Sequence, residues 1–191
     1  MSSRPAFSDQ ELLDYSGEHL LYEVQMFQWM TKTLLTKSSQ FEALERCALI
    51  ESFAIHFRNL FEFFYTQSPR DTDVVAADYF DNPASWSSRP SSVLVAARKR
   101  ADKEVSHLTL QRKDAGDPAK NWPVGAYFNE MRSTIQEFVA TASPKKLHVR
   151  VKEWVNLTYS DRLSLILGMG PVNASTTTMD KFLLVLKDVS E

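Results

Sequence analysis

The chain has 191 residues, of which 43% are hydrophobic and 24% charged, a composition ordinary for one globular domain with a hydrophobic core. Its net charge of −2 excludes a general attraction to nucleic acid or anionic membranes, so such binding would need a local basic patch. The only cysteine, Cys47, excludes an intramolecular disulfide, and no apolar run reaches the roughly 20 residues of a membrane span. Since the N-terminal residues also lack a signal peptide's apolar core, we expect a cytoplasmic protein.

Residues 8–37 are predicted to form the first helix. Ser8 and Glu11 have the spacing of a capping box, which marks a helix start. Gly17 is expected to be a weak point, because glycine inside a helix costs about 1 kcal/mol relative to alanine. One face of this helix is predicted to carry Leu13, Leu20, Val24, Phe27 and Leu34.

Residues 41–65 are predicted to form a central helix, because apolar side chains occupy most of its circumference. Ser38 and Ser39 separate it from the first helix, and so short a link favours antiparallel neighbours. Twelve Phe against five Gly also favour helices over a turn-rich β fold. The widest apolar arc holds Leu49, Ile50, Phe53, Phe57, Leu60, Phe61 and Phe64.

The polar residues of this helix allow two interpretations. Glu51, Arg58 and Glu62 share one stripe, which could be a solvated ladder of ion pairs or a half-buried network facing another helix. His56 and Asn59 flank the apolar arc, where a histidine is most often a hydrogen-bonded boundary residue. Since no second histidine stands at metal-ligand spacing, we predict no metal site. The chain also has no phosphate-cradling glycine loop, so we predict no cofactor.

Residues 66–142 are predicted to hold a linker followed by two further helices. In the linker, Asp71 or Asp73 could cap a short helix that runs through Phe80 and ends at Asn82-Pro83. One long helix begins near Ser91 or Ser92, and the second follows a charged loop at 111–121. The second helix has the most regular stripe of the chain, with Val124, Phe128, Met131, Ile135, Phe138 and Ala142.

The pattern of residues 145–191 leaves their structure open. The segment LHVRVKEWV alternates like a strand, yet Leu147, Val151, Trp154 and Thr158 also fit one face of a helix. We therefore expect an all-α fold, an up-and-down bundle of four main helices in residues 1–144 with a short linker helix. Residues 145–191 would be an extension packed on the same domain, either a small β hairpin or added helical segments. The predicted core is Phe53, Phe57, Leu60, Phe61 and Phe64 against Leu20, Val24, Phe27, Phe128, Met131 and Ile135.

Arg100 and His107 form the most suggestive pair of the chain. Seven residues along an α-helix turn through 700°, so the two side chains point within about 20° of each other. An arginine can hold a phosphate and a histidine can move a proton, the minimum for cleaving RNA through its 2′-hydroxyl. The alternative is an ordinary charged helix face with Arg98, Lys99 and Lys103.

Two segments resemble a group of small bacterial helical proteins. They are ALIESFAIHFRNLFEFFY, with His56, Arg58 and Asn59, and DKEVSHLTLQR, with Lys103 and His107. The group in turn resembles the HEPN superfamily of helical bundles over about residues 8–142. That superfamily includes toxin and phage-defence ribonucleases with an arginine, four to six residues and a histidine, a spacing that Arg100 and His107 meet. Here Ala101 stands where a polar residue usually follows the arginine.

The resemblance implies a metal-independent ribonuclease. His107 would be the general acid and base, Arg100 would stabilise the phosphate, and Arg58, Asn59, Lys103 and His56 would support the pocket. It also implies RNA as a partner and a homodimer that brings two motifs into one cleft. The alternative hypothesis is a non-catalytic interaction module with a protein partner, in which the same polar residues hold the helices in register. The sequence leaves open whether the protein is an enzyme.

Overall fold

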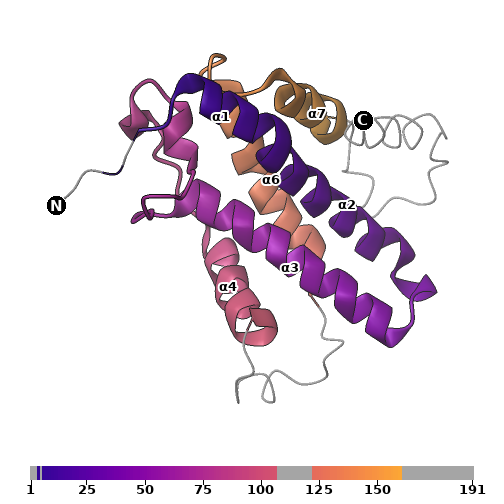
Figure 1. Cartoon of the computed structure of the whole chain (residues 1–191). Helices are drawn as coiled ribbons and strands as arrows, with labels where there is room; N and C mark the ends of the chain where they lie inside the picture. The colour runs from indigo at the N-terminus through magenta and orange to yellow at the C-terminus, as the bar shows by residue number, and fades with distance from the viewer. Residues whose placement is uncertain (1–3, 5, 107–121, 161–191) are drawn as a thin grey trace. The chain divides into compact units, whose positions relative to one another are not determined.

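The computed structural model describes residues 4, 6–106 and 122–160, and all regular structure among them is helical (Figure 1). In chain order the elements are α1 (Asp9–Tyr15), the π-helical turn η1 (Ser16–Leu20), α2 (Leu21–Lys37), the 3-10 turn η2 (Ser38–Gln40), α3 (Ala43–Tyr65), the 3-10 turns η3 (Ala76–Tyr79) and η4 (Pro83–Ser85), α4 (Ser92–Ala101), the π-helical turn η5 (Asp102–Ser106), α6 (Val124–Thr141) and α7 (Val149–Ser160). Because α1 continues through η1 into α2, and α4 into η5, these residues form five helices and no strand. None of the described helices is both long and apolar enough to cross a membrane.

The first helix begins at the predicted capping box. The Ser8 side chain accepts from the backbone N–H of Glu11, and the Glu11 carboxylate accepts from that of Ser8. Leu12 is buried in α1, whereas Leu13, which the pattern placed on the core face, is only half-buried. The reason is the π-helical turn η1, whose extra residue shifts the helix face by one position.

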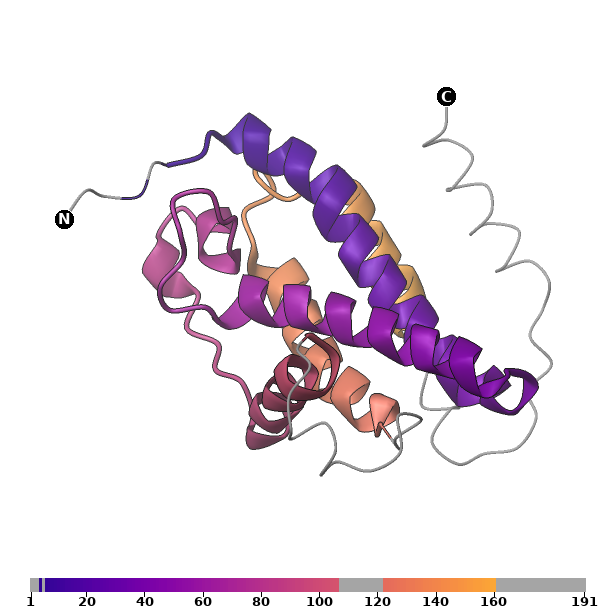
Figure 2. The same cartoon turned by 60° about the horizontal axis from the view of Figure 1, so that its bottom comes forward.

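The central helix α3 packs against α2 along one side and against α4 on another (Figure 2). Phe53 and Phe57 are fully buried, and the ring of Phe27 on α2 lies 5.2 Å from that of Phe53. The predicted core members are buried except Phe61, which is half-buried. Phe63, which the pattern placed outside the arc, is buried instead, because Tyr79 of η3 and Phe138 of α6 pack against its ring.

The linker between α3 and α4 holds two 3-10 turns rather than the predicted short helix capped by Asp71 or Asp73. Asn82-Pro83 starts a turn instead of ending a helix, because the Asn82 side chain caps η4. Asp78 fastens the linker: its carboxylate accepts from the backbone N–H of Val75 and from the guanidinium of Arg4, at 2.9 and 2.8 Å. These contacts join the linker to the N-terminal segment, and η3 itself packs against α3.

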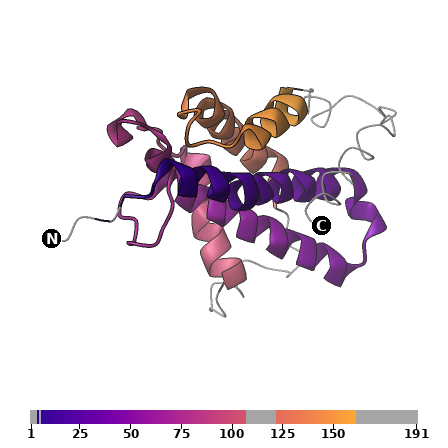
Figure 3. The same cartoon turned by 45° about the horizontal axis from the view of Figure 1, so that its top comes forward.

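Residues 149–160 form helix α7. Of the two structures that the sequence allowed for the C-terminal segment, the helical one is therefore correct for this part. Within α7, Val151 and Val155 are buried at a spacing of four residues, as one face of a helix requires, and Leu147, two residues before the helix begins, is buried with them. This face packs on α6 and η1 (Figure 3). The described residues fall within one compact unit, Met1–Asp161, while the remainder of the predicted 145–191 extension lies outside them.

Candidate functional site

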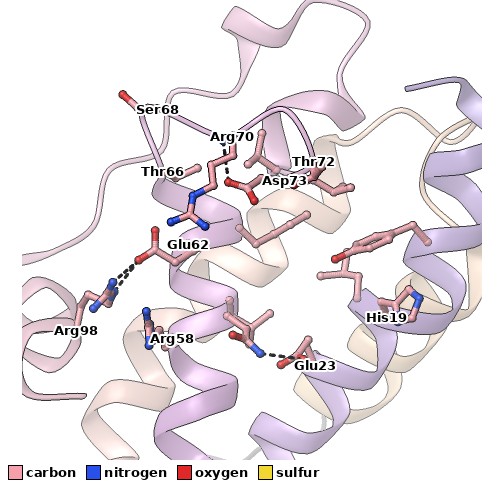
Figure 4. Close-up of a pocket in the computed structure, with 17 residues that line it drawn as sticks. His19, Glu23, Arg58, Glu62, Thr66, Ser68, Arg70, Thr72, Asp73 and Arg98 are labelled. Atoms are coloured by element: carbon pink, nitrogen blue, oxygen red, sulfur yellow. Dashed lines mark hydrogen bonds and ion pairs between the residues drawn. The ribbon is translucent and has the colours of Figure 1, made fainter. Parts of the chain in front are cut away.

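A polar pocket of about 920 Å³ opens beside the C-terminal half of α3 (Figure 4). Its walls come from the first helix, from α3, from the loop at residues 68–75 and from Arg98 of α4. The floor is apolar, since Leu20, Leu60, Phe63 and Val75 are all buried. The volume lies within the usual range of small-molecule sites.

The first helix lines the pocket with one carboxylate and two neighbouring rings, whose planes are tilted by 48° to each other. The ring centroids of Tyr15 and His19 are 5.0 Å apart, and the two residues lie one turn apart along the helix. Burial, together with the charges of Glu23 and Asp73, raises the pKa of the Tyr15 hydroxyl above its ordinary value. Tyr15 therefore stays protonated near neutral pH and offers the pocket a neutral hydroxyl.

Glu23 joins α2 to α3 at the bottom of the pocket. One of its carboxylate oxygens lies 2.8 Å from Nδ1 of His56, and the other accepts from the side-chain amide of Asn59 at 3.1 Å. A carboxylate is only an acceptor, so Nδ1 of His56 must carry the hydrogen in this bond. The rings of Tyr22 and His56 pack edge to face with their centroids 5.5 Å apart, and His56 is buried. His56 is thus a hydrogen-bonded residue at the boundary of the core.

A second set of charges joins α3 to α4. Arg98 donates from Nε to Glu62 at 2.7 Å and also pairs with Asp102, one turn further along its own helix. Burial opposes the charge of Arg98, but the bonds to Asp102 and Glu62 outweigh this effect and raise its pKa. Nε of Arg58 lies 3.6 Å from the carboxylate of Asp102. Arg58 and Glu62 therefore belong to a half-buried network with another helix, the second of the two interpretations of their stripe.

Arg100 lies outside this pocket. Arg98 and Arg100 are two positions apart on α4, so their side chains point in nearly opposite directions. Nε of Arg100 donates to both carboxylate oxygens of Glu104 at 2.9 Å, and its guanidinium lies 4.6 Å from the centre of the Trp122 ring.

The predicted site residues therefore do not share one site. Arg58 and Asn59 line the pocket, His56 lies behind it through Glu23, and Arg100 faces Trp122 instead. Lys103 is exposed on η5. His107 lies outside the described residues, so its distance from Arg100 stays a prediction.

Sequence reasoning missed three charged residues that line the pocket, Glu23, Arg70 and Arg98. Glu23 had a signal, because a carboxylate three residues after Leu20 and one before Val24 borders the apolar face of the helix. Arg98 was assigned to a solvated face, but its side chain is only 20% exposed. Arg70 had no signal, since its place depends on how the linker folds back.

Among the described residues, no group of His, Cys, Asp and Glu is arranged to hold a metal ion.

The chain was also compared with known proteins. Comparison of the chain with protein-family models, with curated proteins and with solved structures found no match. The relation to the HEPN superfamily accordingly stays a prediction from the quoted segments.

Proposed function

We propose that the protein is a HEPN-like helical interaction module that acts by binding and not by catalysis. In this proposal, α1–α2, α3, α4 and α6 are the four helices of the up-and-down bundle. One observation carries the proposal: His56, Asn59 and Arg58 are each engaged with a carboxylate of a neighbouring helical segment, Glu23 or Asp102. Such pairs fix the register of α3 against α2 and α4, which is the role expected of structural polar residues.

Arg100 supports the same proposal. Its guanidinium is held by Glu104 and by the face of Trp122, which is buried next to Phe53 of the core. A phosphate would have to compete with a carboxylate that already has the favoured charge-assisted geometry. The contacts instead hold the end of α4 against Trp122, two residues before α6 begins.

The second candidate is a metal-independent ribonuclease that binds RNA as a homodimer. The observation that favours it is the fixed position of Arg100 over Trp122, because a preorganised guanidinium is what a phosphate site needs. His107 would supply the proton transfers, as the resemblance implies. This candidate requires two copies to bring their Arg100 and His107 side chains into one cleft.

Incubation of the purified protein with a mixed RNA pool in EDTA separates the two candidates. We expect intact RNA with the wild type, with Lys99→Ala and with the Arg100→Ala/His107→Ala double variant. Lys99 is a matched control because it is an exposed cation next to Arg100. Cleavage by the wild type and Lys99→Ala but not by the folded double variant would overturn the interaction module and establish the ribonuclease.

A further inference from the structure

The pocket beside α3 contains two opposite charges that face each other without pairing. Arg70 extends from the linker toward Glu62 of α3 (Figure 4). Among the described residues, no hydrogen bond or ion pair of the Arg70 guanidinium is present. The hydrogen bonds of Arg70 are made by its backbone, whose N–H donates to the Asp73 carboxylate and whose carbonyl accepts from the Asp73 backbone N–H. Arg98 uses Oε1 of Glu62 for both of its contacts, which leaves Oε2 without a partner in the same part of the chain.

The surroundings of this pair exclude a strongly charged ligand. The pocket is lined by the three arginines Arg58, Arg70 and Arg98, and by the three carboxylates Glu23, Glu62 and Asp73. A phosphate dianion would meet like charges on several sides, and like charges close together cost free energy. A ligand with one charge of each sign and no net charge fits this lining better.

The remaining walls favour a ligand with an aromatic ring. The neighbouring Tyr15 and His19 rings, whose planes are tilted by 48° to each other, line the pocket from the first helix, and the side chain of His19 is 65% exposed. Buried Leu20, Leu60 and Phe63 form an apolar floor beneath them. A flat apolar ring of the ligand could pack against the Tyr15 and His19 rings and rest on this apolar floor.

From this arrangement we propose that the pocket binds a small aromatic zwitterion, an α-amino acid with an aromatic side chain. Its carboxylate accepts from the Arg70 guanidinium in the bidentate geometry that arginine favours. Its ammonium group donates to Oε2 of Glu62, and its ring lies against Tyr15 and His19. The proposal goes beyond the proposed function, because neither Arg70 nor Oε2 of Glu62 takes part in the pairs that hold the helices in register.

Titration calorimetry of the full chain with L-tryptophan, tryptamine and indole-3-propionate tests the proposal. Tryptamine lacks the carboxylate and indole-3-propionate lacks the ammonium group, so each loses one charge-assisted contact. We expect saturable binding of L-tryptophan with a Kd below about 1 mM, and binding about 10-fold weaker for each of the other two. The assay involves no RNA, so its outcome is separate from that of the cleavage experiment.

Three variants assign the contacts. Arg70→Ala should weaken the binding of L-tryptophan about 10-fold and leave the binding of tryptamine unchanged. Glu62→Gln should weaken the binding of L-tryptophan and leave the binding of indole-3-propionate unchanged. Arg89→Ala is the matched control, since Arg89 is an exposed arginine that does not line this pocket. Circular dichroism should show that each variant is folded. The proposal is overturned if L-tryptophan gives no saturable binding, if indole-3-propionate binds equally well, or if Arg70→Ala behaves like Arg89→Ala.

Discussion

At Gly17 the first helix packs closely against the segment before α7. A Cβ atom at this position would lie 2.9 Å from Cδ2 and 3.0 Å from Cγ of His148. The His148 ring cannot easily move away, because its Nδ1 accepts from the backbone N–H of Arg150. Next to it, the hydroxyl of Ser16 accepts from the backbone N–H of His148. Gly17 is therefore a site of close approach and not merely a weak point of the helix.

We expect Gly17→Ala to lower the free energy of unfolding by about 1–3 kcal/mol, because the added methyl group overpacks this contact. In a His148→Ala background the contact with the ring is gone, and the remaining Cβ of residue 148 lies 3.4 Å away, an ordinary van der Waals distance. The same Gly17→Ala substitution should then raise the free energy of unfolding by about 1 kcal/mol through helix propensity. Urea denaturation of the four proteins measures both effects. Equal effects in the two backgrounds would show that His148 does not contact Gly17 in solution.

At the scale of elements, the polar residues of α3 act as connections to its neighbours. His56 and Asn59 join it to α2 through Glu23, and Arg58 and Glu62 join it to α4. The side chains of His56 and Glu23 are only 8% and 22% exposed. If one of them is removed, water can therefore replace little of the hydrogen bonding that the other loses. Their pairing should therefore contribute more than a surface ion pair does.

A double-mutant cycle with His56→Ala and Glu23→Ala should give a coupling free energy of about 1–3 kcal/mol, measured by chemical denaturation. The matched control is His19→Ala, which removes an exposed histidine and should change the stability by less than about 0.5 kcal/mol. Additive effects of the two substitutions in the cycle would contradict a register-holding role for His56.

The sequence predicted these elements unequally. Helix α3 was predictable because its apolar side chains recur at helical spacing over several turns. The π-helical turn η1 was not, since Gly17 marks a weak point of the helix but does not reveal an extra residue in the turn, and η1 moved the buried position from Leu13 to Leu12. For α7, the alternation of LHVRVKEWV fitted both a strand and a helix, and packing on α6 and η1 decided for the helix.

At the scale of the whole described unit, α7 covers a face that the preceding helices leave apolar. Val151 is fully buried in this contact, whereas Val149, two residues earlier on the same helix, is 57% exposed. Trp154 adds a directional contact, because its indole N–H donates to the side chain of Gln28 on α2 at 2.9 Å. Helix α7 is thus part of the folded unit and not an appendage on its surface.

We expect Val151→Asp to lower the free energy of unfolding by more than about 3 kcal/mol, because it buries an unpaired charge. Val149→Asp, the same substitution at the exposed start of α7, should change stability by less than about 0.5 kcal/mol and could stabilise the helix N-terminus. Thermal unfolding followed by circular dichroism compares the two variants. Similar melting temperatures for both would mean that α7 is not docked as described.

The sequence by itself determined the helical class, the position of the central helix and most of its buried side chains. Each of these follows from local periodicity and capping, as at Ser8 and along Phe53, Phe57 and Leu60. Only the tertiary structure decided which polar residues share a site. It directed Arg98 into the pocket and Arg100 toward Trp122, and it brought Arg70 from the linker to face Glu62. Those positions depend on how separate helices cross and where an irregular linker folds back, which no spacing along the chain encodes.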